Sequence, residues 1–167
     1  MFKNVLKRES GFTLLELLIV IVIIGILALL IIPNITSAPK KARDTQRKTD
    51  LRAIQKGLEE YFVSNNAYPS TAGIADAVLG SSNGTGPLDN AQNGATPIMK
   101  TVPKDPKGGA TQPYVYYYTP SGTPATSYKL DGCLENGSDN GTGTVAVGSL
   151  TGVTGCTTVG FELVNNN

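Results

Sequence analysis

Residues 11–32 read GFTLLELLIVIVIIGILALLII, and this stretch decides the fold. It places one carboxylate, that of Glu16, near the start of an otherwise apolar helix. The 21 residues from Phe12 to Ile32 would cover roughly 31 Å at about 1.5 Å per residue, enough to cross a hydrocarbon core about 30 Å thick. A charge at bilayer depth costs about 2.5 to 3.5 kcal/mol or more, so Glu16 predicts a functional role and a cationic partner.

The position of Gly11 suggests where that cation comes from. If the chain is cut after Gly11, Phe12 carries a new α-amino group at i,i+4 from Glu16, the spacing at which helical side groups meet. The alternative is an ordinary signal anchor in which Glu16 extends to the lipid headgroups. A cleaved secretory signal is not predicted, because the apolar run is too long and no small-residue cleavage site follows it.

These residues resemble the N-terminus of the type IV pilins and of the pseudopilins of type II secretion. The likeness covers a short basic leader ending in Gly11, the motif from Phe12 to Glu16, the aliphatic run and Pro33, the twenty-second residue counted from Phe12. It implies that a prepilin peptidase cuts after Gly11 and methylates the new amino group of Phe12. It also implies that Glu16 guides each subunit into a helical filament of identical copies, at an assembly platform in the inner membrane.

Length and resemblance together predict an α+β fold with one compact head. We expect a leader over residues 1–11, a long helix over 12–64 and a β-rich head over 65–167. The front of the helix, 12–32, would be the membrane and filament-core part, and its rear, 40–64, would be amphipathic. The rear would pack on a small antiparallel sheet, as in the pilin fold.

The rear of the helix carries an apolar stripe at three- and four-residue steps, the pattern of a helix with one buried face. The stripe consists of Leu51, Ile54, Leu58, Tyr61 and Phe62. Pro33 and Pro39 each lack a backbone donor, so we expect them to kink or locally unwind the helix.

Charge is nearly balanced over the chain, with 14 basic and 13 acidic residues. The basic residues after the apolar run outnumber those of the leader, and the positive-inside rule would therefore place the C-terminal part in the cytoplasm. The resemblance instead places the leader there, before the mature subunit enters an extracellular or periplasmic filament. The two cysteines support this orientation, because they favour an oxidising compartment for the head.

Basic residues on the helix also raise the possibility of nucleic-acid binding, since they could neutralise phosphates. They are Lys40, Lys41, Arg43, Arg47, Lys48, Arg52 and Lys56. Acidic residues interleave with them and no aromatic stacking platform accompanies them, which disfavours DNA as a partner. Anionic lipid headgroups or a mixed-charge surface between subunits fit the pattern better.

The head shows short alternating apolar runs bounded by turn residues, which predicts a small antiparallel sheet. The expected strands are 114–119, 127–134, 144–147 and 159–164. Their apolar face would pack on the helix stripe, with Tyr116 and Tyr118 facing the core and Tyr117 pointing outward. Residues 71–97 are expected to form a long exposed connection with a short helix at 73–79 and to offer a contact surface.

Cys133 and Cys156 are 23 positions apart in a chain without histidine. This spacing matches neither a Cys/His zinc set nor an adjacent redox pair, so a structural disulfide is the natural prediction. It would stabilise the head by about 3 kcal/mol through loop-closure entropy. The alternative is two buried free thiols, because sequence alone cannot establish pairing.

Residues 102–109, VPKDPKGG, followed by Tyr114, Tyr116 and Tyr118, resemble the loop and strand of major pseudopilins. A tryptophan usually stands after the second proline in that family, whereas this chain has Lys107 there and no tryptophan anywhere. This departure and the two cysteines favour a pilin head over a secretion pseudopilin. A proline-rigidified turn leading into an edge strand explains the same residues without any function.

Asp131, Glu135 and Asp139 are candidate oxygen ligands for calcium, as in a loop of some pseudopilins. Their spacing does not match an EF-hand, and the neighbouring Asn-Gly pairs equally predict turns. No histidine and no phosphate-binding glycine motif is present, so neither an enzyme nor a cofactor is predicted.

Three functions remain in view. The first is the structural subunit of a type IV pilus, which is the main prediction. The second is a pseudopilin of a type II secretion system, built by the same assembly chemistry. The third is a binding module for sugar or DNA that sits on a membrane anchor and never polymerises. An uncut leader on the cellular protein would favour the third.

Overall fold

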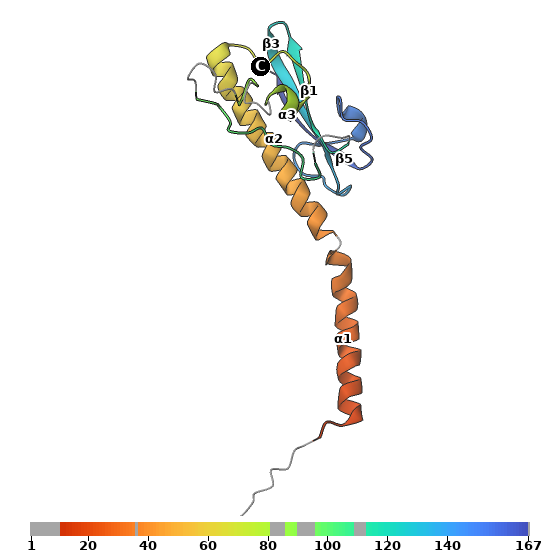
Figure 1. Cartoon of the computed structure of the whole chain (residues 1–167). Coiled ribbons are helices and arrows are strands. Elements are labelled where there is room, and N and C mark those ends of the chain that lie inside the picture. The colour runs from red at the N-terminus through yellow and green to blue at the C-terminus, as the bar shows by residue number, and fades with distance from the viewer. Residues whose placement is uncertain (1–10, 36, 81–85, 90–95, 109–112, 167) are drawn as a thin grey trace, which may run out of the picture. The chain divides into compact units, whose positions relative to one another are not determined.

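A computed structural model of the chain (Figure 1) describes residues 11–35, 37–80, 86–89, 96–108 and 113–166. The chain divides into two compact units, Met1–Ala38 and Pro39–Asn167. Residues 1–10 of the predicted leader lie outside the described residues.

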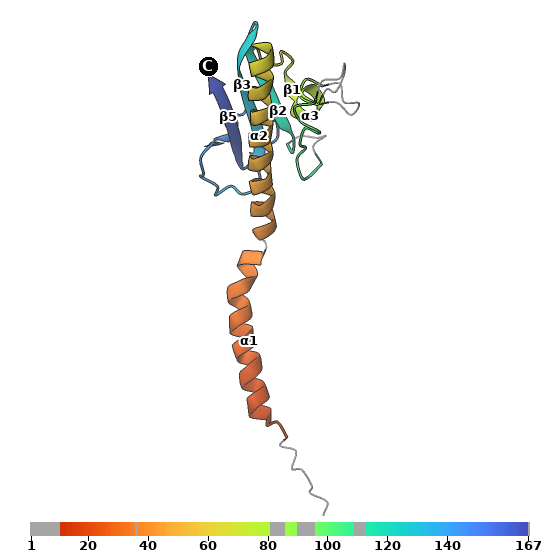
Figure 2. The same cartoon turned by 90° about the vertical axis from the view of Figure 1, so that its left-hand side faces the viewer.

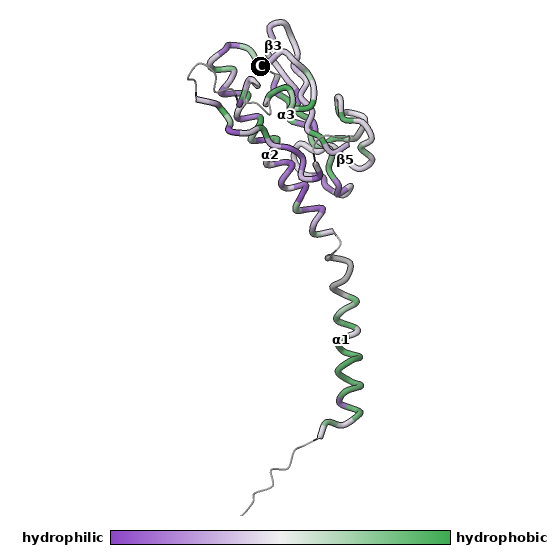
Figure 3. The backbone as a smooth tube through the Cα atoms, in the orientation of Figure 1, coloured by the Kyte–Doolittle hydropathy of each residue, from purple (hydrophilic) through white to green (hydrophobic). Residues whose placement is uncertain are grey.

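The first unit contains α1, Leu14–Ile35. Every large apolar side chain from Leu14 to Leu29 is between 47% and 91% exposed. Figure 3 shows the coloured part of this helix as mostly apolar. Among the helices in the described part of the chain, none combines the length and the apolarity needed to cross a membrane. The predicted membrane segment, 12–32, includes residues 30–32, whose side chains lie outside the described set.

The predicted single helix over 12–64 is two helices in the structure. The first ends at Ile35 and the second, α2, spans Ala38–Asn65. Pro33 lies within the last turn of α1. Pro39 lies in the first turn of α2, where a missing N–H removes no intrahelical hydrogen bond. Pro39 therefore stands at a helix start, and the long helix that was expected to kink or locally unwind at Pro33 and Pro39 is divided between these two residues.

In the described residues, five strands form one antiparallel sheet in the order β1-β2-β3-β5-β4. The strands are β1 Gly73–Ile74, β2 Tyr116–Gly122, β3 Ala125–Leu134, β4 Thr144–Val145 and β5 Val159–Asn166. The four predicted strands are thus present. A 3-10 helix, Val147–Ser149, replaces the end of the third, and the predicted helix at 73–79 is β1 followed by α3, Ala75–Val78.

The core of the second unit lies between α2 and one face of the sheet, as Figure 2 shows. Leu51, Ile54 and Leu58 of the predicted stripe are fully buried there, together with Tyr118 and Phe161 from the sheet. Strand alternation also holds as predicted, because Tyr116 is buried in this core. Tyr117 belongs to a separate small cluster with the cysteines.

The segment 71–97 is not the exposed connection that the sequence predicted. Ala75, Leu79 and Leu88 are fully buried in the main core. Backbone bonds from Leu88 N to Leu79 O and from Met99 N to Leu88 O hold it in place, at 2.8 and 2.9 Å. The sequence did not indicate this burial, because isolated aliphatic residues between Gly and Asn show no periodicity. The parts at 81–85 and 90–95 lie outside the described residues.

Candidate assembly site

The start of α1 is closed by a reciprocal pair of contacts between Thr13 and Glu16. Thr13 N and Oγ1 donate to Glu16 Oε2 at 3.1 and 2.9 Å, and Glu16 N donates to Thr13 Oγ1 at 3.2 Å. This is a capping box, in which a Thr at the N-cap and a Glu three residues later satisfy the free backbone donors of the first turn. The Glu16 carboxylate is therefore held at the helix start.

This arrangement assigns Thr13 a part that the sequence analysis missed. The signal was present, because Thr followed three residues later by Glu before an apolar run is the sequence pattern of a capping box. The three other processing and assembly residues lie in the same segment. Phe12 is 79% exposed, and a side chain at Gly11 would meet open space.

The exposed surface of α1 requires a partner beyond the described part of its unit. Apolar side chains cover all sides of the helix, and leaving them in water costs about 25 cal/mol per Å². An apolar surface of this size marks a membrane or protein contact. Glu16 is the one charged residue in α1, so a partner that buries this helix also encounters that carboxylate.

In the second unit, the conspicuous polar feature is Arg47, which is fully buried. Its guanidinium donates to both oxygens of Asp105, at 2.6 and 3.0 Å. It also donates to Asp44 at 2.7 Å and to Glu135 at 2.9 Å. One cation on α2 therefore binds the 102–108 loop and the end of β3.

Glu135 also binds two further cations, Arg43 and Lys107. Arg43 Nε and Nη2 donate to its two oxygens at 2.6 and 2.7 Å, and Lys107 Nζ lies 3.1 Å from Oε2. The Asp44 carboxylate accepts the backbone N–H groups of Glu135 and Asn136, at 2.9 and 2.8 Å. These contacts fasten the loop after β3 to the first half of α2.

The contacts keep Glu135 and Arg47 ionised. The hydrogen bond from Arg43 is the largest cause of a pKa of Glu135 well below its ordinary value, and Lys107 and Arg47 act in the same direction. Burial alone would lower the pKa of Arg47, yet its bonds to Asp105, Asp44 and Glu135 raise it above the ordinary value. Removing one partner would therefore leave a buried charge without compensation.

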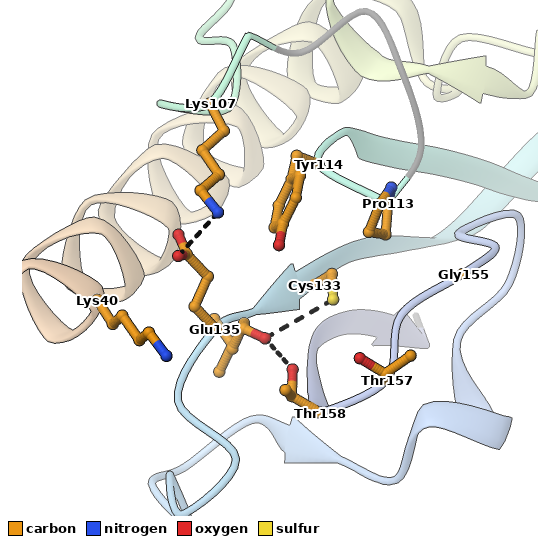
Figure 4. A pocket seen from close by; sticks show the side chains of 10 residues that line it. Lys40, Lys107, Pro113, Tyr114, Cys133, Glu135, Gly155, Thr157 and Thr158 are labelled. Carbon is orange, nitrogen blue, oxygen red and sulfur yellow. Dashed lines mark hydrogen bonds and ion pairs between the residues drawn. The ribbon is translucent and has the colours of Figure 1, made fainter. Parts of the chain in front are cut away.

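Lys107, which stands where major pseudopilins usually have tryptophan, is part of this cluster. Its Nζ lies 4.3 Å from the centroid of the Tyr114 ring. Figure 4 shows Lys107 and Glu135 at the edge of a cavity of about 430 Å³. Lys40, Tyr114, Thr157 and Thr158 also line it. A cation thus occupies the tryptophan position and uses both an aromatic face and a carboxylate.

Three of the seven basic residues of α2 that were considered for phosphate binding are paired within the head. Arg43, Arg47 and Lys48 are bound by carboxylates of the same unit, the last by Asp139 at 2.7 Å. Their charge is thus largely neutralised within the head. The contacts also remove part of the conflict with the positive-inside rule, because these three cations belong to a folded head.

The structure does not bring the three calcium candidates together. Asp131 is buried on β3 and accepts the N–H of Thr151 at 2.9 Å. Glu135 binds Arg43, and Asp139 binds Lys48. Within the ranges that the structure describes, no group of three or more acidic, His or Cys side chains could hold a metal ion.

Cys133 and Cys156 form a disulfide, as the sequence predicted, with Cα atoms 5.7 Å apart. Cys133 lies on β3, on the sheet face opposite α2. Val153 is buried with the pair, and Tyr117 and Leu150 pack against it. The disulfide closes a loop over the outer face of the sheet.

A capped apolar helix in one unit, and an antiparallel sheet packed on a second helix in the other, define the class of pilin-like filament subunits. Comparison with known families agrees: residues 6–32 match the "Prokaryotic N-terminal methylation motif", and residues 34–149 match "Type II secretion system (T2SS), protein G". The chain belongs to this protein G family of pseudopilins, whose members are structural subunits and not enzymes.

Named relatives support the assignment. The chain is 38% identical over 136 residues to the "Type II secretion system core protein G" of Pseudomonas aeruginosa, covering 80% of this chain and 92% of the relative. The protein of the same name from Dickeya chrysanthemi is 31% identical over 152 residues, covering 82% and 97%. That from Aeromonas hydrophila is 37% identical over 106 residues, covering 64% and 73%. No solved structure matches the chain.

These matches change the order of the predicted functions. Lys107 and the two cysteines favoured a type IV pilus, with the secretion pseudopilin as the alternative. The family match favours that alternative. Lys107 and the disulfide are local changes within a shared fold, and a few residues carry less weight than similarity over most of the chain.

Proposed function

We propose that this chain is a pseudopilin that assembles into the filament of a type II secretion system. The observation that carries the proposal is the protein G match over residues 34–149. The similarity to the Pseudomonas aeruginosa protein, which reaches 92% of that relative's length, supports it. The exposed apolar surface of α1 supports assembly, because such a surface needs a partner.

Processing would create the cation that Glu16 needs. The precursor is cut after Gly11 by a prepilin peptidase, and the amino group of Phe12 is methylated, as the match to a methylation motif over residues 6–32 suggests. Phe12 then carries a positive charge next to the capped start of α1. In the filament, the Glu16 carboxylate pairs with the terminal amine of a neighbouring subunit, and this attraction sets the register between copies.

Assembly moves α1 from lipid to a bundle of identical helices. The precursor is held in the inner membrane with its N-terminus in the cytoplasm, and an assembly platform there extracts it into a periplasmic filament. The apolar side chains are out of water both in the membrane and in the filament, so their burial favours neither state strongly. The pairing of the Glu16 charge is therefore the main difference in the contacts of α1 between a free subunit and a docked one.

The test combines mass spectrometry of the subunit N-terminus with electron microscopy of filaments and a secretion assay in the host. We expect a chain that begins with methylated Phe12, periplasmic filaments, and loss of exoprotein secretion when the gene is deleted. Gly11→Ala or a bulkier residue should leave the leader in place. Recovery of a monomer that still begins at Met1 would contradict the proposal.

The second candidate is the subunit of a surface type IV pilus, which the disulfide and Lys107 favour. It uses the same processing and the same Glu16 contact. The two functions differ in whether the filament stays in the periplasm or extends from the cell surface. Long fibres sheared from the cell surface that contain this chain, together with normal secretion in the deletion strain, would select the pilus.

A further inference from the structure

Asp131 is a buried carboxyl group beneath the disulfide-closed loop. Its residue is fully buried on β3. One oxygen, Oδ2, accepts the backbone N–H of Thr151 at 2.9 Å. The other, Oδ1, is buried and has no hydrogen-bond partner in the described part of the chain. A buried carboxylate oxygen without a donor is costly, which suggests that Asp131 carries a proton.

The nearest cation to Asp131 in the described part of the chain, Lys129, compensates its charge only in part. Glu162 stands directly opposite it on β5, and Tyr117 stands opposite on β2. Lys129, two residues earlier on β3, bonds to Glu162 at 3.2 Å. Residues 147–156, which cover this face and are called the strap here, contain no charged residue. Asp131 therefore faces another carboxylate whose own cation lies toward solvent.

The strap lies directly on the sheet. Val153 is buried with the disulfide, and Leu150 and Tyr117 pack against them. Gly152 approaches the Tyr117 ring so closely that a Cβ there would lie 2.2 Å from it. A Cβ on Gly160 would likewise lie 2.3 Å from the Leu150 side chain. With the strap seated in this way, water reaches Asp131 only if the strap lifts.

We propose that the strap is a pH-controlled lid on the outer face of the sheet, closed while Asp131 shares a proton with Glu162 and released when that proton is lost. In the closed state, the protonated Oδ1 donates to a Glu162 oxygen and Oδ2 accepts from Thr151. When the proton passes to solvent, two carboxylates face each other under an uncharged cover. Lifting the strap then hydrates Asp131 and relieves the repulsion.

The titration of Asp131 falls in the physiological range. Burial is the main cause that raises the pKa of Asp131 to about 7, and the neighbouring Glu162 adds to it, while the N–H of Thr151 and the charge of Lys129 act against it. With the strap open, the group would return toward its ordinary value of 3.8. At pH values between these two pKa values, the closed state therefore holds a proton that the open state has lost. As pH rises through this range, the closed state becomes less stable relative to the open state. Above this range, the difference in stability between the two states changes little.

Amide hydrogen exchange at Thr151 tests the lid on the processed full-length chain in detergent micelles. After correction for the intrinsic pH dependence of exchange, the opening constant should rise by up to about tenfold per pH unit between about pH 5 and 7 and level off above that. In Asp131→Asn, the amide can donate to Glu162 and accept from Thr151 at every pH. Its opening constant should stay low and flat.

Two further variants complete the test. Glu60→Gln, which removes an exposed charge on α2, should follow the wild-type curve. Glu162→Gln removes the repulsion and should shift the rise to lower pH, which gives a second readout if Asp131→Asn does not fold. A flat wild-type curve would overturn the proposal. So would a curve for Asp131→Asn or for Glu162→Gln that matches the wild-type curve. The result does not depend on whether the filament belongs to a secretion system.

Discussion

The two long helices of this chain bury their surfaces in opposite ways. In α1, every large apolar side chain from Leu14 to Leu29 remains at least 47% exposed. In α2, even Arg47 and Asp44 are buried, along with Leu51, Ile54 and Leu58. The apolar surface of α1 is therefore not covered within the described part of its own unit, whereas the buried face of α2 is covered by the rest of the head.

This difference separates what each helix does. A change in α1 should alter assembly and leave the head intact, because the contacts it removes lie outside the unit. A change in the buried face of α2 should alter the free energy of unfolding of the head, because the contacts it removes hold loops to the helix. The predictions below test this division.

The largest effect is expected from Glu16. Glu16→Ala should give processed, membrane-held subunits that do not enter filaments, because the attraction to a neighbouring amine is lost. Glu16→Gln should fail in the same way, although glutamine at this position still completes the capping box. The measurement is the fraction of subunits in sheared filaments.

Thr13→Ala is the matched control for the cap. It removes the side-chain cap of α1 at a cost of about 0.5 to 2 kcal/mol and keeps the Glu16 charge. We expect fewer filaments but continued assembly. Wild-type filament yield from Glu16→Gln, or complete loss from Thr13→Ala alone, would show that the cap matters more than the charge.

In α2, Arg47→Ala should have the largest effect on stability. It leaves Asp105, Asp44 and Glu135 without their shared cation, and breaking a buried ion pair in this way costs about 3 to 5 kcal/mol. Chemical denaturation of the processed chain in detergent would measure the loss. Lys56→Ala, an exposed change on the same helix, should stay within about 0.5 kcal/mol of wild type. Equal effects of the two variants would refute this account of Arg47.

Removal of the disulfide should have the next largest effect on the stability of the head. The double variant Cys133→Ser, Cys156→Ser should lower the free energy of unfolding by about 3 kcal/mol, because the unfolded chain regains the entropy of an open loop. Filament formation through α1 should persist at temperatures where the head remains folded. A free-thiol count on the denatured, unreduced wild type checks the starting point, and two reactive thiols would contradict the crosslink.

Acid should weaken the head through Glu135. Its pKa is lowered in the folded state, mainly by Arg43, so the stability it contributes is complete above its ordinary value of 4.5. That contribution is lost as pH falls toward the lowered folded value. Glu135→Gln should reduce this acid sensitivity, at the cost of lower stability at neutral pH. Melting temperature against pH for both proteins is the measurement.

The smallest effect is expected at Lys129, whose side chain is 42% exposed beside Glu162. Glu162 is only 13% exposed, but the Lys129 end of the pair is largely hydrated. The pair should therefore contribute at most about 1 kcal/mol, and Lys129→Ala should change the free energy of unfolding little at neutral pH. A loss of several kcal/mol would mean that Lys129, and not a shared proton, compensates the buried Asp131, which would contradict the protonated state proposed for the closed strap.

Much of this protein was predictable because local patterns determine local structure. The apolar helix and the stripe at Leu51, Ile54 and Leu58 follow from spacing alone, because a helix repeats every 3.6 residues. The methylation motif was found by resemblance to a known family. The strands followed from alternation and turn residues. The disulfide followed from two cysteines with no better use.

The tertiary structure alone decided which distant groups meet. Asp105 and Glu135 lie 58 and 88 residues from Arg47, and no periodicity relates them, so the sequence could suggest only a basic helix face. The burial of Leu88, and of Asp131 beside Glu162, likewise depends on how loops and strands pack. Periodic contacts can be read along the chain, whereas long-range electrostatic contacts exist only after it has folded.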